Sequence, residues 1–367
     1  MNELITRINF KTILDFVSNY KYPFIIFLTS RIIIFLVLNF ANEYGLGVAQ
    51  LTQWDAQHYV HIASNGYVFN GQYKNEGSFI AFFPLYPIIV RIVSIVTFLG
   101  ITYSALIVSF IFGLASALLL YKIAKSWKGE DAAVNAVFLF SFFPMSVFLT
   151  APYTESLFFF LVLSIFWLLE KKKLTLAAVM ISLSLVTRIT GLILIPIFIY
   201  ELYKNGKSII YFIPHLIITV IPLSIFLYFQ YLKYGTPFAF FIAEKTNWYN
   251  ESTFPWIGFK TLLSYLSSDI MYRVELIFLL IMVITLILAR KYINKSLLFF
   301  SWGVILLSLS ETFILSLPRY VMLVIPFYLF WGMFLVKHSF SKQLIFIVTS
   351  CWMAFNTVLF ILSKHIF

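Results

Sequence analysis

The sequence has little charge and almost no cysteine. Charged residues make up 11% of the 367-residue chain, only 15 of them are acidic, and the one cysteine, Cys351, lies in an apolar run. One cysteine excludes a disulfide framework. Hydrophobic residues make up 61% and the mean hydropathy is +0.94. This excludes a water-soluble protein, because no soluble core buries so much apolar surface.

Three further patterns are absent. The apolar runs are continuous instead of alternating, which excludes a transmembrane β-barrel. Neither a P-loop nor a G-x-G-x-x-G motif opening a helix occurs, so the sequence predicts no nucleotide site. The amphipathic segment 1–21 lacks the uninterrupted apolar core and cleavage site of a signal peptide, and we expect it to be retained. A net charge of +11 is explained by cytoplasmic loops and does not predict a nucleic-acid partner.

Apolar runs of bilayer-spanning length dominate the chain. They predict an all-α polytopic membrane protein, a bundle of about eleven transmembrane helices in one integral membrane domain over residues 1–367. A segment at 88–99 is too short to span and is expected to lie along the interface. The expected spans are 22–40, 102–123, 132–149, 154–169, a hairpin of two short helices in 174–203, 208–232, 270–289, 296–315, 320–336 and 344–362.

Lysine and arginine gather in alternate loops, which places those loops in the cytoplasm. Segments 41–100 and 233–269 then become outer loops. The outer ends of distant spans carry ionisable side chains that are expected to meet in one outward cavity: Asp55, Glu155, Arg188 and Arg319. Arg31 falls in the middle of a span and is expected to face the bundle, where an ion pair is as plausible as a catalytic role.

The first outer loop carries most of the polar candidates. Asp55, after Trp54, suits a general base, or a helix N-cap. His58 and His61 follow at helical spacing, which permits metal ligation with Asp55, or simply a polar face on an interfacial helix. Glu76 suits a second acid, a sugar hydrogen bond or a metal ligand, and equally a solvated charge. No cofactor is predicted; a divalent metal remains an alternative.

Four later residues complete the candidates. Tyr153 and Glu155 stand where a span begins, so Glu155 either serves the site or follows the preference for acids in a first helical turn. Arg188, at an apolar hairpin tip, needs an anion, which a lipid phosphate or Glu155 would supply. Arg319 suits the same phosphate, although arginine beside a span's end often extends to the interface.

Taken together these stretches resemble the GPI mannosyltransferase II (PIG-V)-like family within the GT-C glycosyltransferases. The blocks that carry the resemblance are WDAQHY (54–59), IASNGY (62–67), AFFPLYP (81–87), Phe143-Pro144, YTES (153–156), Thr187-Arg188 with Gly191, and Arg319-Tyr320 with Pro326. The first-loop blocks are specific to the family, whereas each later block alone is a weak signal.

The resemblance implies an inverting transferase in the cell membrane with its active site outside, or lumenal in the ER of a eukaryote. Members of the family use a polyprenyl-phosphate sugar, typically mannose, as donor, and the acceptor would be a hydroxyl of a lipid or glycan. Asp55 matches the family's presumed base. Arg188 matches the position for donor phosphate, with Arg319 beside it. The remaining candidates, Trp54, His58, His61, Glu76, Tyr153 and Glu155, would bind sugar or acceptor or support those that do.

Two other classes remain open from the residues alone. Outward acids and Arg31 also suit an ion pathway, so a lipid or solute transporter is the first alternative. No internal repeat occurs, and the charges gather at one depth, which disfavours a transporter. A non-catalytic subunit of a glycosylation complex is the second.

Overall fold

The computed structural model describes residues 10–45, 47–204, 206, 209–312, 314 and 316–364. Regular structure in these residues is helical, apart from one isolated bridge between Ser252 and Glu311. The α-helices are α1 (Phe10–Asn42), α2 (Asp55–Asn65), α3 (Leu85–Thr97), α4 (Ile101–Lys128), α5 (Glu130–Ser141), α6 (Glu155–Glu170), α7 (Leu174–Leu185), α8 (Leu194–Lys204), α9 (Ile209–Tyr234), α10 (Ala239–Trp248), α11 (Pro255–Ser264), α12 (Ile270–Ala289), α13 (Lys295–Ser308), α14 (Leu317–Val321), α15 (Ile325–Phe334) and α16 (Ser339–Ile361). Short 3-10 helices are η1 (Val48–Thr52), η2 (Asn75–Ala81), η3 (Ser146–Leu149), η4 (Ile189–Ile193) and η5 (Leu335–Lys337).

The predicted all-α polytopic membrane fold is confirmed. Helices α1, α4, α9, α12 and α16 provide five segments in the described chain that are long and apolar enough to cross a bilayer. The other expected crossings correspond to shorter helices, namely α5, α6, α7, α8, α13 and α15. Large apolar side chains are exposed along α9 and α16, as a lipid-facing surface requires.

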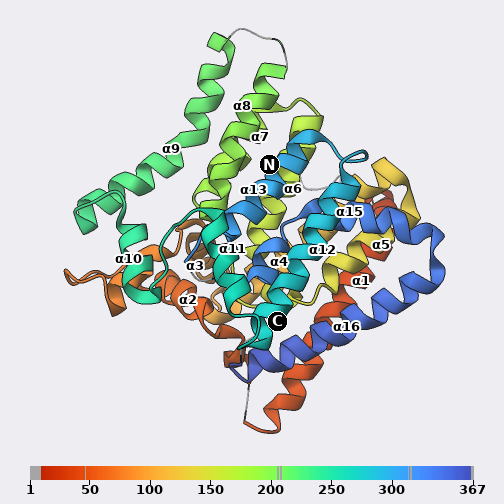
Figure 1. The fold of residues 1–367 in the computed structure, drawn as a ribbon, viewed down its shortest axis with the longest axis horizontal. Helices are drawn as coiled ribbons and strands as arrows, with labels where there is room; N and C mark the ends of the chain where they lie inside the picture. Colours follow the sequence, from red (N-terminus) through yellow and green to blue (C-terminus); the bar gives the residue numbers. More distant parts are fainter. Residues whose placement is uncertain are drawn as a thin grey trace.

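The core is built around α5, which packs between α4 and α15, while α6 packs between α4 and α7. Gly332 permits the close approach of α15, because a Cβ there would lie 2.7 Å from the Ala132 carbonyl oxygen. The Asn135 side chain donates to the Gly332 carbonyl at 3.1 Å. Helices α1 and α16 lie side by side along one edge of this core (Figure 1).

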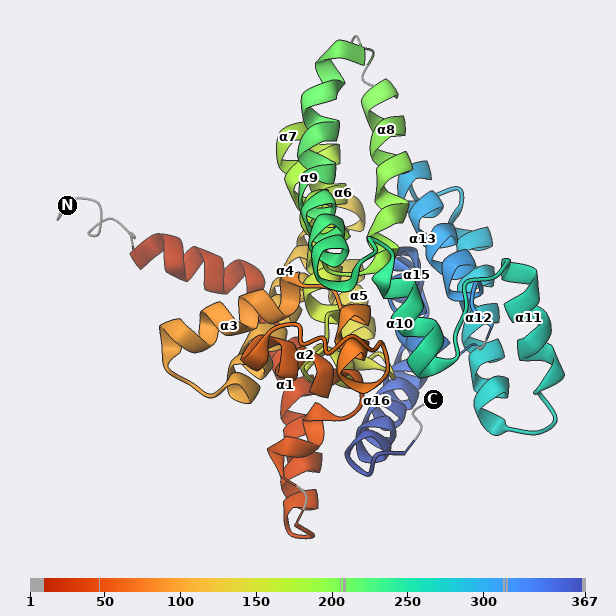
Figure 2. The same cartoon turned by 90° about the vertical axis from the view of Figure 1, so that its left-hand side faces the viewer.

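The predicted hairpin within 174–203 is confirmed. Helices α7 and α8 are joined through η4, and with α9 they rise to the top of Figure 2. Gly191 lets η4 fold tightly back on α7, since a Cβ there would lie 2.7 Å from the Ser184 carbonyl oxygen. This tight return places Arg188 in the turn between the two helices.

Three expected spans have the wrong length or continuity. The span at 132–149 is helical only to Ser141, before η3; that at 296–315 ends at Ser308; and that at 320–336 is divided into α14 and α15. The division has a local cause, because Pro318 and Pro326 each occupy the first turn of their own helix. Proline favours that position and ends whatever helix precedes it.

Arg31 binds the chain where α5 ends, three residues before Pro144, which cannot continue a helix. Its buried guanidinium, 1% exposed, donates to the carbonyl oxygens of Ser141 at 2.8 Å and Ser146 at 2.7 Å, and to Thr150 Oγ1 at 2.7 Å. These carbonyls belong to the end of α5 and to η3, where helix geometry leaves acceptors unpaired. The arginine faces the bundle as predicted, but the ion-pair alternative is wrong within the described chain.

The two expected outer loops pack against each other. Helix α10 contacts η2, and the Asn247 amide donates to the Tyr73 carbonyl at 2.8 Å. The second loop contains two helices, α10 and α11. The 88–99 segment forms most of α3, as predicted, and its interfacial position stays a prediction.

Candidate functional site

A cavity of about 600 Å³ lies where these loops meet the ends of the core helices. Its wall is formed by the start of α2, the segment before α6, the turn between α7 and α8, and by α10, the end of α13 and α14. Segments distant in sequence therefore share one enclosed space, which is the arrangement expected of a ligand site.

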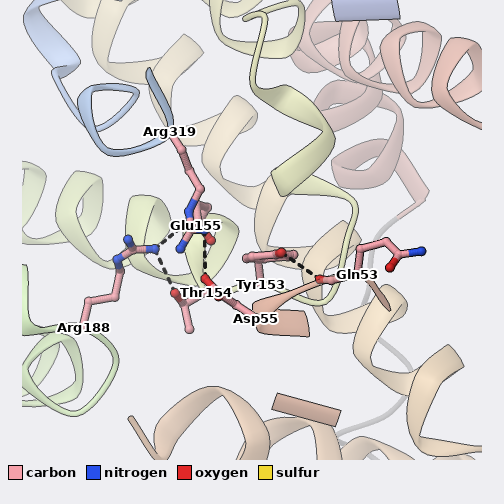
Figure 3. Close-up of polar contacts among 7 residues, drawn as sticks. All are labelled: Gln53, Asp55, Tyr153, Thr154, Glu155, Arg188 and Arg319. Carbon is pink, nitrogen blue, oxygen red and sulfur yellow. Dashed lines mark hydrogen bonds and ion pairs between the residues drawn. The ribbon is translucent and has the colours of Figure 1, made fainter. Parts of the chain in front are cut away.

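A network of charged side chains stands at this cavity (Figure 3). Glu155 Oε1 lies 2.6 Å from both Arg188 Nη1 and Arg319 Nε. Arg319 Nη1 continues to Asp55 Oδ2 at 2.9 Å, and Arg188 Nη1 also donates to Thr154 Oγ1 at 3.0 Å. The structure thus brings together the four ionisable residues expected at outer ends of spans.

The network is buried to different depths. Glu155 is 1% exposed and both arginines are 9% exposed, whereas the Asp55 side chain is 27% exposed. Arg319 therefore does not extend to the interface. Asp55 is the least buried of the four and lines the cavity together with both arginines, which suits groups that must meet a substrate.

Backbone geometry fixes the two ends of the network. Trp54 and Ser316 adopt positive φ angles of 50° and 62°, directly before the helices that carry Asp55 and Arg319. Non-glycine residues rarely adopt this conformation, and such strain concentrates at functional sites. Trp54 itself provides the N-cap position of α2, so the alternative role of Asp55 as N-cap is wrong.

Aromatic rings surround the Arg319 guanidinium. Its central carbon lies 5.0 Å from the Tyr153 ring centroid, 5.1 Å from that of Phe148 and 5.3 Å from that of Tyr320. The Tyr153 hydroxyl donates to the Gln53 carbonyl at 2.9 Å, which ties α6 to the residues before α2. Rings at these distances stabilise a cation that has been removed from water.

The network keeps hydrogen-bonding capacity for a ligand. The arginines use only Nη1 of Arg188 and Nε and Nη1 of Arg319 in the contacts of this network. Because guanidinium has five N–H donors, both arginines can bind an anion without releasing the carboxylates.

Two further first-loop candidates, His58 and His61, are not part of the cavity lining. His58 stacks on Phe82, with ring centroids 4.4 Å apart, and His61 stacks on Phe79 at 4.0 Å. Burial lowers the pKa of His58, which favours its neutral form. No cluster of three potential metal-ligating side chains occurs among the residues described. Glu76 belongs to η2, but its side chain lies outside the described residues.

Sequence reasoning missed two carboxylates that line the same cavity, Glu244 on α10 and Glu311 after α13. Burial, Glu311 and Asp55 together raise the pKa of Glu244 to about 8. Burial also raises the pKa of Glu311. A usable signal existed, because Glu244 and Trp248 are four residues apart in an apolar loop and therefore share one helix face.

The raised pKa of Glu244 predicts a pH-dependent stability. Its ordinary value is 4.5, so between pH 4.5 and 8 the folded protein binds more protons than the unfolded one, and stability falls as pH rises. In solutions above pH 8, we expect Glu244→Gln to raise the midpoint temperature of thermal inactivation. Near pH 4.5, the same substitution should change this temperature little. Glu170→Gln, at an exposed ion pair, is the control. A shift of equal size at every pH would contradict the prediction.

Comparison with known proteins shows which family the chain is similar to. The family described as mannosyltransferase (PIG-V) matches residues 27–272. "GPI mannosyltransferase 2" of Drosophila pseudoobscura pseudoobscura is 33% identical over 120 residues, which are 30% of this chain and 25% of that protein. The Drosophila melanogaster protein of that name is 31% identical over 176 residues, 44% of this chain and 36% of the relative. "GPI alpha-1,6-mannosyltransferase 2" of Cricetulus griseus is 26% identical over 211 residues, which are 51% of this chain and 41% of the relative.

These alignments cover only part of each relative, which limits the properties of the relatives that can be assigned to this chain. The chain aligns with between 25% and 41% of the length of these relatives. No solved structure matches it. The family match contains Asp55, Glu155, Arg188 and Glu244, whereas Glu311 and Arg319 lie beyond its end. Because the match extends over more than half of the chain, this multi-pass membrane protein belongs to the mannosyltransferase (PIG-V) family.

Proposed function

We propose that the protein is a GT-C-type mannosyltransferase that moves mannose from a polyprenyl-phosphate donor to a hydroxyl acceptor on the non-cytoplasmic face. One observation carries the proposal. A carboxylate with access to the cavity, Asp55, is joined through Arg319 and Glu155 to Arg188. The residues to which we assign the proton acceptor and the two phosphate-binding groups thus stand together, in a family described as mannosyltransferases.

The proposed reaction is a single in-line displacement. Asp55 accepts the proton of the acceptor hydroxyl as its oxygen forms a bond to the anomeric carbon of mannose. The bond from that carbon to the phosphate oxygen breaks, and its electron pair leaves with the polyprenyl phosphate. The configuration of the anomeric carbon is inverted. A phosphate is a good leaving group, so no second carboxylic acid has to protonate it.

The arginines are suited to the departing phosphate. Arg188 and Arg319 retain N–H donors, and each is held in place by Glu155, so little reorganisation is needed when negative charge develops. Charge-assisted bonds from guanidinium to phosphate are among the stronger hydrogen bonds in proteins. The contact of Arg319 with Asp55 also orients the base.

An apolar groove beside the cavity supports a lipid-linked donor. It has a volume of about 510 Å³ and is lined by residues of α2, α3 and α9 and by Val186. Val186 is two residues from Arg188, and its carbonyl accepts from the Leu85 amide at 3.0 Å. A phosphate at Arg188 would therefore place an attached chain near this groove. We assign the groove to the polyprenyl chain, whose burial is favoured by its apolar surface.

The test is a transfer assay with the purified full chain in lipid nanodiscs. It is incubated with polyprenyl-phosphate mannose carrying a labelled sugar, together with a membrane lipid extract, and the products are examined by mass spectrometry. We expect acceptor products heavier by one labelled hexose, with an inverted anomeric linkage. An intact donor together with solute flux in proteoliposomes would instead favour a transporter. Transfer only after adding other membrane proteins would favour a non-catalytic subunit.

A further inference from the structure

A second group of residues lines the cavity and is not used by the proposed displacement. Glu244 and Trp248 come from α10, and Glu311 comes from the segment after α13. Glu244 has no hydrogen bond or ion pair to another residue of the described chain. Its carboxylate is thus available to a ligand, while Asp55 and Glu155 are already bound to arginine.

Glu311 is held by a hydrogen bond from a neighbouring segment. The Asn250 amide donates to Glu311 Oε2 at 2.9 Å, and Asn250 Oδ1 accepts from the Thr312 amide at 3.2 Å. Gly258 of α11 packs directly on this segment, because a Cβ there would lie 2.2 Å from the Leu309 carbonyl oxygen. Neighbouring helices therefore determine where the carboxylate stands, as a binding group requires.

Two other cavity residues indicate a polar ligand with an apolar face. Thr190 is only 6% exposed, and its Oγ1 has no hydrogen-bond partner among the residues described. A buried hydroxyl without a partner costs about 1–3 kcal/mol, which a ligand hydroxyl would offset. Trp248 packs edge-on against His58 and Phe82, with ring centroids 5.7 Å apart in both pairs. The rings of His58 and Phe82 thus fix the indole of Trp248 at the cavity.

We infer that Glu244, Glu311 and Trp248 form a subsite for a sugar acceptor, whose hydroxyls the carboxylates bind while the indole packs on its carbon face. This inference rests on the proposed function and specifies the acceptor as a glycan or glycolipid headgroup. The two groups of residues suit different substrates. The donor phosphate is attracted to Arg188 and Arg319, whereas the hydroxyls of a neutral polyol can bind the two carboxyl groups through hydrogen bonds.

The experiment uses α-mannobiose as the probe and the full chain in nanodiscs. Binding is followed by tryptophan fluorescence, and transfer from polyprenyl-phosphate mannose is measured in parallel. In Glu244→Ala and Glu311→Ala we expect the mannobiose Kd to rise at least about tenfold, because each variant loses the hydrogen bonds between the sugar and a carboxyl group. The donor KM should change by less than about twofold. Glu170→Ala, outside the cavity, is the matched control, and Glu244→Gln provides a shape-conserving variant if alanine disturbs folding.

The outcomes separate this inference from the proposed function. If the wild type transfers mannose to none of the acceptors, the mannosyltransferase proposal is overturned. Mannobiose binding still tests the subsite in that case. An unchanged Kd in the folded glutamate variants would overturn the subsite. A raised donor KM with unchanged mannobiose binding would overturn it as well, because the glutamates would then hold the donor sugar. Failure of the wild type to bind mannobiose while it transfers mannose to membrane lipids would also exclude a sugar subsite.

Discussion

Replacement of Asp55 by asparagine is expected to reduce mannosyl transfer by about 10²–10⁴-fold, the usual contribution of a positioned general base. Asparagine has nearly the same shape and keeps an oxygen that can accept from Arg319 Nη1, which lies 2.9 Å from the carboxylate. It cannot take up the proton of the acceptor hydroxyl at neutral pH. The chemical step should therefore fail in a protein that still folds.

The measurement must separate chemistry from binding. A fall in kcat with donor and acceptor KM nearly unchanged is the expected pattern, because the proton transfer occurs only in the transition state. Asp131→Asn, an exposed acid in the first turn of α5, is the matched control for loss of one negative charge. If Asp55→Asn transfers mannose as fast as the wild type, Asp55 is not the base, and Glu244 becomes the next carboxylate to examine.

The sequence was informative about elements and less so about their ends. Long apolar runs at α1, α4, α9 and α12 are continuous, and the bilayer's thickness makes each of them a helix of predictable length. Helix α5 ends at Ser141, three residues before Pro144, which cannot continue a helix because it lacks an N–H and its ring clashes with the preceding turn. The predicted boundary passed over this local signal, whereas the contact of Arg31 with the Ser141 carbonyl, 110 residues away in sequence, appears only in the structure.

The sequence likewise predicted some features of the candidate site and not others. Loop charges place Asp55, Glu155, Arg188 and Arg319 at equivalent ends of their spans, so their proximity could be expected from topology. Which carboxylate meets which arginine depends on side-chain packing and appears only in the structure. Glu244 escaped notice because a lone glutamate in an outer loop usually faces water; its spacing from Trp248 indicated a shared helix face, but not that the packing of α10 against η2 would place this face at the cavity.

Glu155 is expected to control stability more than chemistry. Its Oε1 is shared by Arg188 and Arg319, and at 1% exposure it is the most buried member of the network. Glu155→Gln removes the negative charge and leaves two buried guanidinium groups with only Asp55 as a carboxylate partner. Breaking a buried ion pair from one side costs about 3–5 kcal/mol. We expect a loss of this order in the free energy of unfolding, measured by denaturant titration in micelles.

A double-mutant cycle with Arg188→Gln distinguishes this charge imbalance from simple loss of packing. Arg188→Gln alone should cost less than Glu155→Gln, because Glu155 then keeps Arg319 at 2.6 Å. The double variant restores charge balance, so its loss should be smaller than the two single losses added together. Additive losses would show that the pair contributes through packing alone. Full stability of Glu155→Gln would contradict the central position of this carboxylate, since the arginines would then need no shared counter-charge to remain buried.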